Sequence, residues 1–111
     1  MAKLVLTFQG VLIREYPLEA MPVSIGRIEG NDVRIDHPTV SGRHARVEPA
    51  PEGFVLVDLG SRNGSFVNGK KVARAVLRSN DWISLGSHVL IFKDGVADRR
   101  GGTESIQTRT L

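Results

Sequence analysis

The sequence of 111 residues contains no cysteine. This absence excludes disulfide bonds, thiolate zinc sites and cysteine nucleophiles, and it fits a reducing compartment. Long apolar runs are also missing: residues 1–9 alternate too quickly to form the apolar region of a signal peptide, and no stretch is long enough to span a membrane. We therefore expect a soluble, cytoplasmic protein with one compact domain whose core is held by packing alone.

Charge of either sign is modest. Fifteen Lys and Arg against twelve Asp and Glu leave a formal net charge of +3, which by itself does not indicate nucleic-acid binding. Eleven of the basic residues are arginine, whose planar guanidinium can bind a phosphate through two hydrogen bonds. Composition alone leaves open whether these arginines solubilise the surface or form a phosphate site.

Short strand-like runs recur along the chain, and helical periodicity is almost absent. The runs span residues 3–8, 11–18, 22–27, 33–35, 44–48, 54–59, 82–85 and 88–93. Asn68-Gly69 predicts a two-residue type I′ hairpin turn, and Asn63-Gly64 and Asn80-Asp81 are further candidate turns. These patterns predict an all-β fold, a two-sheet β-sandwich of about 11 short strands. The aromatic residues within the runs are expected in its core, namely Phe54, Phe66, Trp82 and Phe92.

Polar residues and glycine are combined in four segments in a way that a plain sandwich does not require. The segments are Gly26-Arg27, Asn31-Asp32-Val33, residues 40–45 and residues 58–65. Each lies at a strand end or in a connection, and the connections of a sandwich gather at two rims. If Arg27, Ser41 and Asn63 share a rim, their side chains match a phosphorylated side chain, which carries about −1.5 to −2 charges and three acceptor oxygens.

The order of these segments resembles the forkhead-associated (FHA) domain family over roughly residues 3–93. The family's elements read here as Gly26-Arg27, Asn31-Asp32-Val33, Ser41-Gly42-Arg43-His44, residues 58–64 and Asn68-Gly69, followed by a last turn and strand in residues 77–86. The resemblance implies an FHA-like sandwich with ligand-binding loops at one rim. It also implies a non-catalytic signalling adaptor or regulator that binds phosphothreonine-containing proteins phosphorylated by a Ser/Thr kinase.

The resemblance also implies roles for single residues. Arg27 and Ser41 would contact the phosphate, and Asn63 would hydrogen-bond the peptide backbone. Arg43 and Arg62 would add charge or contact residues that flank the phosphothreonine. The threonine methyl group is expected to enter a small apolar pocket, which would favour phosphothreonine over phosphoserine.

Two further groups of positions follow from the resemblance. Gly42 stands where many members of the family carry a larger, often basic, residue. Either its backbone N–H substitutes for that residue, or Arg43 or Arg62 reaches across to the ligand. Structural support of the site is assigned to Gly26, His44, Gly64 and Asn68.

The residues themselves also bear on other classes of function. Ser41, His44 and Asp58 could be imagined as a hydrolase triad, but no nucleophile-elbow sequence surrounds the serine. The histidines at positions 37, 44 and 88 have no metal-ligand spacing, and residues 69–71 form no nucleotide-binding phosphate loop. We therefore expect no enzyme, no metal and no cofactor. A phosphorylation-independent scaffold, or a nucleic-acid-binding sandwich with a basic rim, stays open as the alternative.

The chain changes character near residue 94. Residues 94–111 contain too few apolar residues to be buried, so we interpret them as a flexible tail that follows a domain of residues 1–93. Thr103 and Thr108 in this segment are candidate phosphorylation sites, each followed three residues later by an apolar residue. A phosphorylated tail could occupy the binding rim of its own or a neighbouring chain, and an inert end is the alternative.

Overall fold

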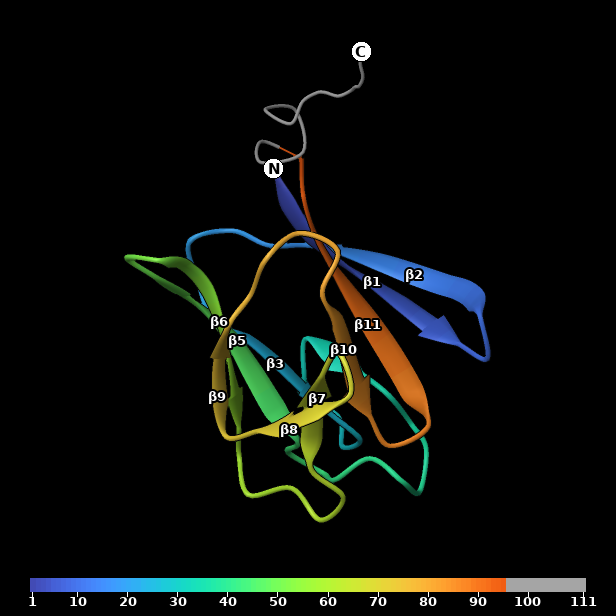
Figure 1. Cartoon of the computed structure of the whole chain (residues 1–111). Coiled ribbons are helices and arrows are strands. Elements are labelled where there is room, and N and C mark those ends of the chain that lie inside the picture. The colour runs from blue at the N-terminus through green and yellow to red at the C-terminus, as the bar shows by residue number, and fades with distance from the viewer. Residues whose placement is uncertain (96–111) are drawn as a thin grey trace.

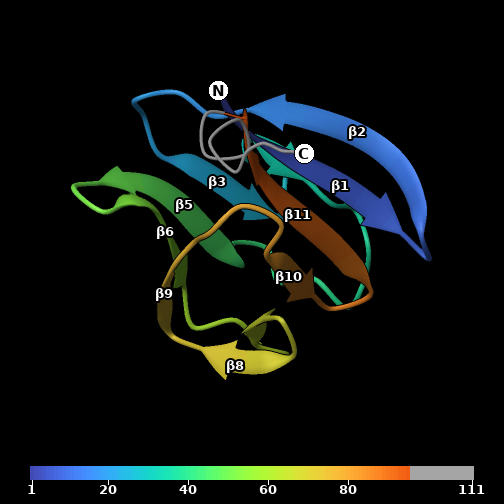
Figure 2. The same cartoon turned by 45° about the horizontal axis from the view of Figure 1, so that its top comes forward.

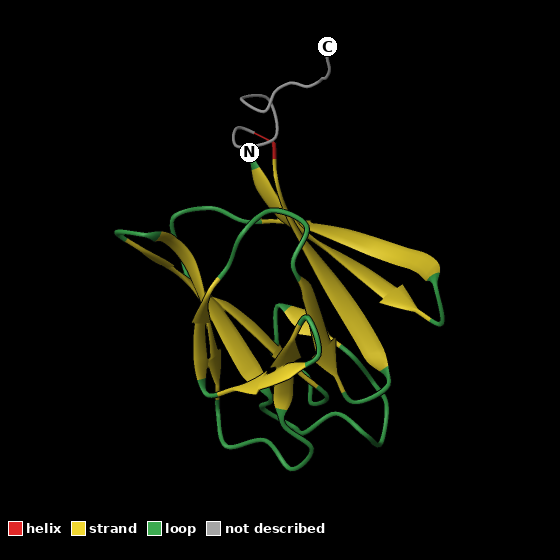
Figure 3. Cartoon of the chain, viewed as in Figure 1, coloured by secondary structure: helices red, strands yellow, loops and turns green. Residues whose placement is uncertain are grey.

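The computed structural model describes residues 1–95, which form eleven strands and two sheets (Figures 1 and 3). The strands are β1 (Ala2–Phe8), β2 (Val11–Pro17), β3 (Val23–Gly26), β4 (Val33–Arg34), β5 (Ala45–Ala50), β6 (Gly53–Asp58), β7 (Ser65–Val67), β8 (Lys70–Val72), β9 (Arg74–Val76), β10 (Trp82–Leu85) and β11 (His88–Asp94). The prediction of an all-β fold with about 11 short strands is confirmed. Sequence patterns gave no range for β9, which is three residues long.

The two sheets differ in size. The six-stranded sheet has the order β2-β1-β11-β10-β7-β8, and the five-stranded sheet has the order β4-β3-β5-β6-β9. All pairs in the larger sheet are antiparallel, whereas β3 and β4 in the smaller sheet run parallel. β1 and β11 pair over seven positions, from Ala2 opposite Asp94 to Phe8 opposite His88. This pairing brings the two ends of the described chain together.

The core lies between the sheets and follows the period of two along each strand. Alternate residues of both sheets are buried in one cluster, and its members at the centre of the strands include Leu4, Leu6, Ile25, Val47, Leu56, Ile83, Leu90 and Phe92. Burying one such side chain fully contributes roughly 1.5–3 kcal/mol to folding. Packing of the two inner faces is therefore the main stabilising interaction of this cysteine-free chain.

The predicted turns can be tested on the backbone. Asn68 and Gly69 have φ angles of 52° and 85°, so both residues of this hairpin turn adopt the positive φ that a type I′ turn requires. Asn80 has a φ angle of 78°, and Asn tolerates this left-handed region better than most residues. The turns expected at positions 68–69 and 80–81 are therefore present.

The expectation that all four aromatic residues belong to the core was wrong for two of them. Phe92 is buried and Phe54 packs against the core cluster, but Trp82 is 60% exposed. Because neighbouring residues in a strand point to opposite faces, burial of Ile83 turns Trp82 outwards. Phe66 pairs with Ser84, which lies two residues from Trp82, so Phe66 also lies on the outer face.

Several of the loops that join the strands gather at the end of the sandwich opposite the N-terminus, the lower end in Figure 1. We define the loop rim as the connections of residues 27–32, 35–44 and 59–64, together with the β10–β11 turn at residues 86–87. Figure 2 gives a second view of the same arrangement. Among residues 1–95, no helix is long and apolar enough to cross a membrane.

The C-terminal predictions fall largely outside the described residues. Asp94 still belongs to β11 and pairs with Ala2. Residues 96–111, including Thr103 and Thr108, lie beyond the described range. The tail, its phosphorylation and its docking on a rim therefore stay predictions.

Candidate functional site

Arg27 directly follows β3 at the loop rim and is held in place by two hydrogen bonds. Its backbone N–H donates to the Ser41 carbonyl at 3.0 Å, and its side-chain Nε donates to the Val40 carbonyl at 3.0 Å. The side chain is exposed, and within residues 1–95 its two Nη groups have no hydrogen-bond partner. A fixed guanidinium therefore presents free donors to the solvent.

Gly26 allows the end of β3 to lie directly against the neighbouring loop. A Cβ atom at this position would lie 2.2 Å from the Gly42 carbonyl oxygen, so any side chain here would force the backbone apart. The same carbonyl accepts hydrogen bonds from the Asn31 side chain at 2.9 Å and from the Ile28 N–H at 3.3 Å. Close backbone contact thus connects the loop that carries Arg27 to the loop that carries Ser41.

Ser41 faces the loop that follows β6. Its Oγ accepts a hydrogen bond from the backbone N–H of Arg62 at 2.9 Å. Because this bond uses a lone pair of the oxygen, the hydroxyl proton is left to donate to a ligand. The Ser41 backbone N–H donates to Nδ1 of His44 at 3.1 Å, which fixes the orientation of the serine.

His44 is completely buried and binds both the loop that carries Ser41 and the loop that ends at Gly64. Its Nδ1 accepts from Ser41, so the ring proton lies on Nε2, which donates to the Gly64 carbonyl at 2.8 Å. Gly64 itself has a φ angle of 85°, a left-handed conformation that favours glycine. The imidazole therefore braces the site through its neutral form.

Asn63 completes the cluster from the same loop. Its Nδ2 donates to the Thr39 carbonyl at 2.8 Å, and the residue is otherwise exposed. Within residues 1–95 its side-chain oxygen and second amide hydrogen have no hydrogen-bond partner, so they are available for a peptide backbone. Arg62, the residue before Asn63, is also exposed, and its backbone N–H contacts Ser41.

Asp58 organises the loop from which Arg62 and Asn63 project. Its carboxylate accepts hydrogen bonds from the hydroxyl groups of Ser61 and Ser65, both at 2.6 Å, and from the backbone N–H groups of Gly60 and Ser61, both at 3.0 Å. Burial raises the pKa of Asp58, but the hydrogen bonds from Ser61 and Ser65 outweigh it and hold the pKa below its ordinary value. The ionised carboxylate is thus the centre of this loop.

Sequence reasoning missed this role of Asp58, Ser61 and Ser65. The signal was present as Asp58 followed three residues later by Ser61, a spacing at which an Asp side chain can accept a nearby backbone N–H in a turn. The sequence patterns place Asp58 in the motif of residues 58–64 and in the rejected hydrolase triad, and assign it no part in organising the loop. The Gly64 N–H donates to Ser61 Oγ at 3.0 Å, so Ser61 connects the Asp58 carboxylate to the backbone of Gly64.

The arrangement of Ser41, His44 and Asp58 is not that of a hydrolase triad. Both ring nitrogens of His44 bind backbone groups, and the partner of Ser41 Oγ is a backbone N–H. A triad requires the base to accept the serine hydroxyl proton and a carboxylate to orient the base. Within residues 1–95 there is also no group of three or more His, Cys, Asp or Glu residues that could hold a metal ion.

The structure therefore brings most of the predicted site residues to one rim. Hydrogen bonds connect the loops that carry Arg27, Ser41, Gly42, Arg62 and Asn63. The exposed Arg43 lies in the same loop as Ser41.

Asn68 is not among the residues that meet at this rim. It lies beyond the other end of β7, where its side chain bonds Asp81 and the N–H of Trp82. Its role here is to join the β7–β8 turn to the start of β10.

The FHA domain family model matches residues 23–86, a range that contains every loop of the site described above. The chain belongs to the FHA domain family. This is a family of binding modules. The resemblance first drawn from the order of the sequence motifs is therefore confirmed.

Relatives and solved structures agree with this membership. The FHA domain is 41% identical to the ABC transporter ATP-binding/permease protein Rv1747 of Mycobacterium tuberculosis over 82% of this chain and 10% of that protein. Its structure is similar to that of the FhaA FHA domain complexed with the intracellular domain of Rv3910, with a TM-score of 0.76 and 30% identity over 84% of this chain and all of that one.

A second similar structure is that of Mycobacterium tuberculosis EmbR in complex with a low-affinity phosphopeptide. The TM-score is 0.74 at 32% identity, and the match covers 83% of this chain and 24% of that one. The chain spans between 10% and 56% of the length of the first curated relatives that it matches.

Proposed function

We propose that this FHA domain binds phosphothreonine-containing proteins, with Arg27 and Ser41 holding the phosphate and Asn63 holding the peptide backbone. The observation that carries the proposal is the convergence at one rim of a fixed guanidinium, a hydroxyl with a free proton and a side-chain amide. These groups come from three connections of the sandwich, so the fold is needed to assemble them. They match a dianion with three acceptor oxygens.

Energies of the right size are available from these groups. Hydrogen bonds to a charged group contribute about 1.5–3 kcal/mol each. Two or three such bonds supply most of the roughly −8 kcal/mol that corresponds to micromolar affinity. The backbone N–H of Gly42 and the exposed side chains of Arg43 and Arg62 add further donors next to the phosphate position.

The comparisons support the same chemistry. The similar FhaA domain is bound to the intracellular domain of Rv3910, and EmbR to a phosphopeptide. By analogy, the partners of this domain are substrates of a Ser/Thr kinase, and the domain acts as an adaptor or regulator in the cytoplasm, where kinases find ATP. Catalysis has no part in this proposal, because the polar side chains of the site are fixed on backbone groups.

The test is binding of matched peptides. A phosphothreonine peptide library selects the best sequence, which is then made in phosphothreonine, phosphoserine and unphosphorylated forms for fluorescence anisotropy. We expect the unphosphorylated peptide to bind at least 100-fold more weakly, since about 2.7 kcal/mol is less than two charge-assisted bonds supply. Phosphoserine should bind about 4-fold more weakly, because one buried methyl group contributes about 0.8 kcal/mol.

Two outcomes would count against the proposal. Equal affinity for phosphorylated and unphosphorylated peptides would remove phosphate dependence. Binding to DNA or RNA that weakens steeply with salt and ignores peptide phosphorylation would favour the nucleic-acid alternative.

A further inference from the structure

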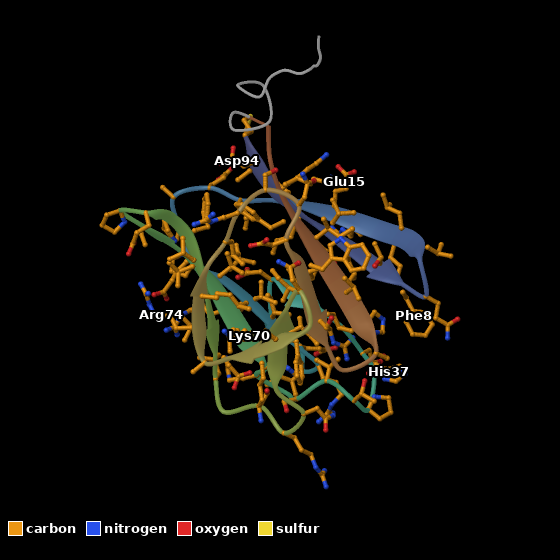
Figure 4. The ribbon with its side chains drawn as sticks, in the orientation of Figure 1. Phe8, Glu15, His37, Lys70, Arg74 and Asp94 are labelled. Atoms are coloured by element: carbon orange, nitrogen blue, oxygen red, sulfur yellow. The ribbon has the colours of Figure 1, made fainter. Side chains whose placement is uncertain are left out.

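Part of the loop rim is a chain of polar groups that the binding site does not use directly. It runs from His37 through Thr39 and Ser87 to His88, and so connects the loop before Ser41 to the β10–β11 turn. Phe8 of β1 packs against both rings, with centroids 6.1 Å from His37 and 4.6 Å from His88. Figure 4 shows Phe8 and His37 on the same side of the molecule, close to the rim.

Three contacts link the four side chains. Nδ1 of His37 lies 2.9 Å from Thr39 Oγ1, which lies 3.2 Å from Ser87 Oγ, which in turn lies 3.0 Å from Nδ1 of His88. Each contact needs one proton to be a hydrogen bond. The two hydroxyl groups supply two protons, so the third must come from one of the two rings.

The backbone decides which ring supplies this proton. The Thr39 N–H also points at Nδ1 of His37, at 3.3 Å, so this nitrogen must be an acceptor. The third proton therefore lies on Nδ1 of His88. The Thr39 hydroxyl can donate to Ser87 Oγ at 3.2 Å. When it donates to Nδ1 of His37 instead, next to the Thr39 N–H, all protons in the chain point from His88 towards His37.

His88 can supply this proton without being charged. Burial, together with the neighbouring His37, lowers the pKa of His88. The neutral ring with its proton on Nδ1 satisfies the chain. A second ring proton, on Nδ1 of His37, would leave the Thr39 N–H without this acceptor and would turn the Thr39 hydroxyl towards Ser87 Oγ.

Thr39 is the point at which this chain meets the binding site. Its carbonyl accepts the side chain of Asn63 at 2.8 Å, and the carbonyl of the next residue, Val40, accepts Nε of Arg27 at 3.0 Å. The Ser87 N–H also donates to Thr39 Oγ1 at 3.0 Å, which ties the threonine to the β10–β11 turn. Rotation of the Thr39 peptide group would therefore move the partners of two ligand-binding side chains.

We propose that His37 is a positioning residue for phosphopeptide binding: as an unprotonated acceptor it fixes Thr39, and its protonation weakens the hold on Asn63 and Arg27. The proposal rests on the proposed function above. Phe8 of β1 and His88 of β11 pack on the His37 ring. Of these two side chains, only His88 can carry a charge. The neighbouring Asp36 is exposed and lies 3.9 Å from Arg34.

The test compares pH profiles of three proteins with the selected phosphothreonine peptide, measured by anisotropy between pH 5.5 and 8. His37→Asn keeps an acceptor, because an Asn side-chain oxygen can bind the N–H two residues on, but it cannot be protonated. His37→Ala removes the acceptor. The phosphate itself titrates near pH 6, but it does so equally for all three proteins, so only ratios between them are interpreted.

We expect His37→Asn to bind within about 2-fold of the wild type at pH 8, and His37→Ala to bind about 5-fold more weakly at every pH. At pH 5.5 the wild type should have lost about 5-fold more affinity than His37→Asn. Rescue by Asn and loss of the extra pH dependence together separate positioning from a merely structural role. Parallel pH profiles of the wild type and His37→Asn would overturn the proposal.

Failure of the proposed function would look different. If none of the three proteins bound the phosphothreonine peptide at pH 8, the function would be wrong, and the side-chain amide signal of Asn63 in NMR spectra would still test the inference. We expect that signal to shift with the His37 ring on acidification of the wild type and to stay unchanged in His37→Asn. A signal that ignores His37 would exclude the coupling.

Discussion

The loop rim and the outer face of the six-stranded sheet differ in what they offer a ligand. The outer face carries exposed apolar side chains, among them Leu12 and Trp82, and two hollows of about 570 and 290 Å³. These hollows are lined by β1, β2, β10, β11 and residues next to them, and by none of the predicted site residues. The rim instead offers hydrogen-bond donors in fixed directions. Concave volume therefore does not locate the site in this molecule.

The difference follows from what each kind of ligand requires. A phosphate gains its energy from a few directed, charge-assisted bonds and needs little buried area. At the rim, side chains are fixed on backbone carbonyls, as Arg27 is on Val40 and Asn63 is on Thr39. On the outer face, side chains such as Leu12 are half exposed and offer no directed bond. Preorganised donors, rather than shape, distinguish the rim.

The largest expected effect comes from removing the guanidinium that faces the phosphate at the loop rim. We expect Arg27→Ala to weaken binding of the phosphothreonine peptide at least 100-fold, because the guanidinium supplies up to two bonds of about 1.5–3 kcal/mol each. Fluorescence anisotropy measures the affinity, and thermal unfolding checks that the domain is intact. Unchanged affinity with an intact fold would place the phosphate elsewhere.

The matched control for Arg27→Ala is Arg74→Ala. Arg74 is exposed on β9, away from the loop rim (Figure 4), so this variant removes the same charge without removing a site donor. We expect its affinity to stay within about 2-fold of the wild type. A similar loss in both variants would indicate that overall charge, and not the rim, attracts the ligand.

A smaller effect, on stability, is expected from the support of the rim. Asp58→Asn removes the charge that accepts four hydrogen bonds and turns an amide donor towards other donors, so we expect a loss of about 2–3 kcal/mol in the free energy of unfolding. Denaturant titration at pH 7 measures this loss. The exposed Asp36 provides the control, and Asp36→Asn should change stability by less than about 0.5 kcal/mol.

The same carboxylate gives a pH dependence of stability. Folding lowers the pKa of Asp58 below its ordinary value of 3.8, so its contribution is fully present above that value and is lost as the pH falls through the folded pKa. The wild type should therefore lose stability more steeply than Asp58→Asn below about pH 4. Equal slopes for the two proteins in this range would show that Asp58 does not support the loop as its ion.

The sequence predicted the sandwich because alternation and Asn-Gly turns are local signals. It indicated Arg27, Ser41 and Asn63 as candidate ligand contacts because they belong to an ordered motif. It could not decide which of Trp82 and Ile83 points inwards, because alternation defines two faces without saying which one the other sheet covers. The meeting of His37 with His88 was equally hidden, since it depends on the pairing of β10 with β11 and the path of a loop from the other sheet.

The smallest expected effect comes from a substitution on the outer face of the six-stranded sheet. Leu12 is 56% exposed on β2, so Leu12→Thr keeps a strand-forming residue and should change the free energy of unfolding by less than about 1 kcal/mol. Anisotropy should give an unchanged affinity for the phosphothreonine peptide, because no bond of the rim involves β2. A loss of affinity without a loss of stability would mean that the bound partner reaches around the sandwich to the apolar face, and recognition would then combine directed bonds at the rim with burial of apolar area.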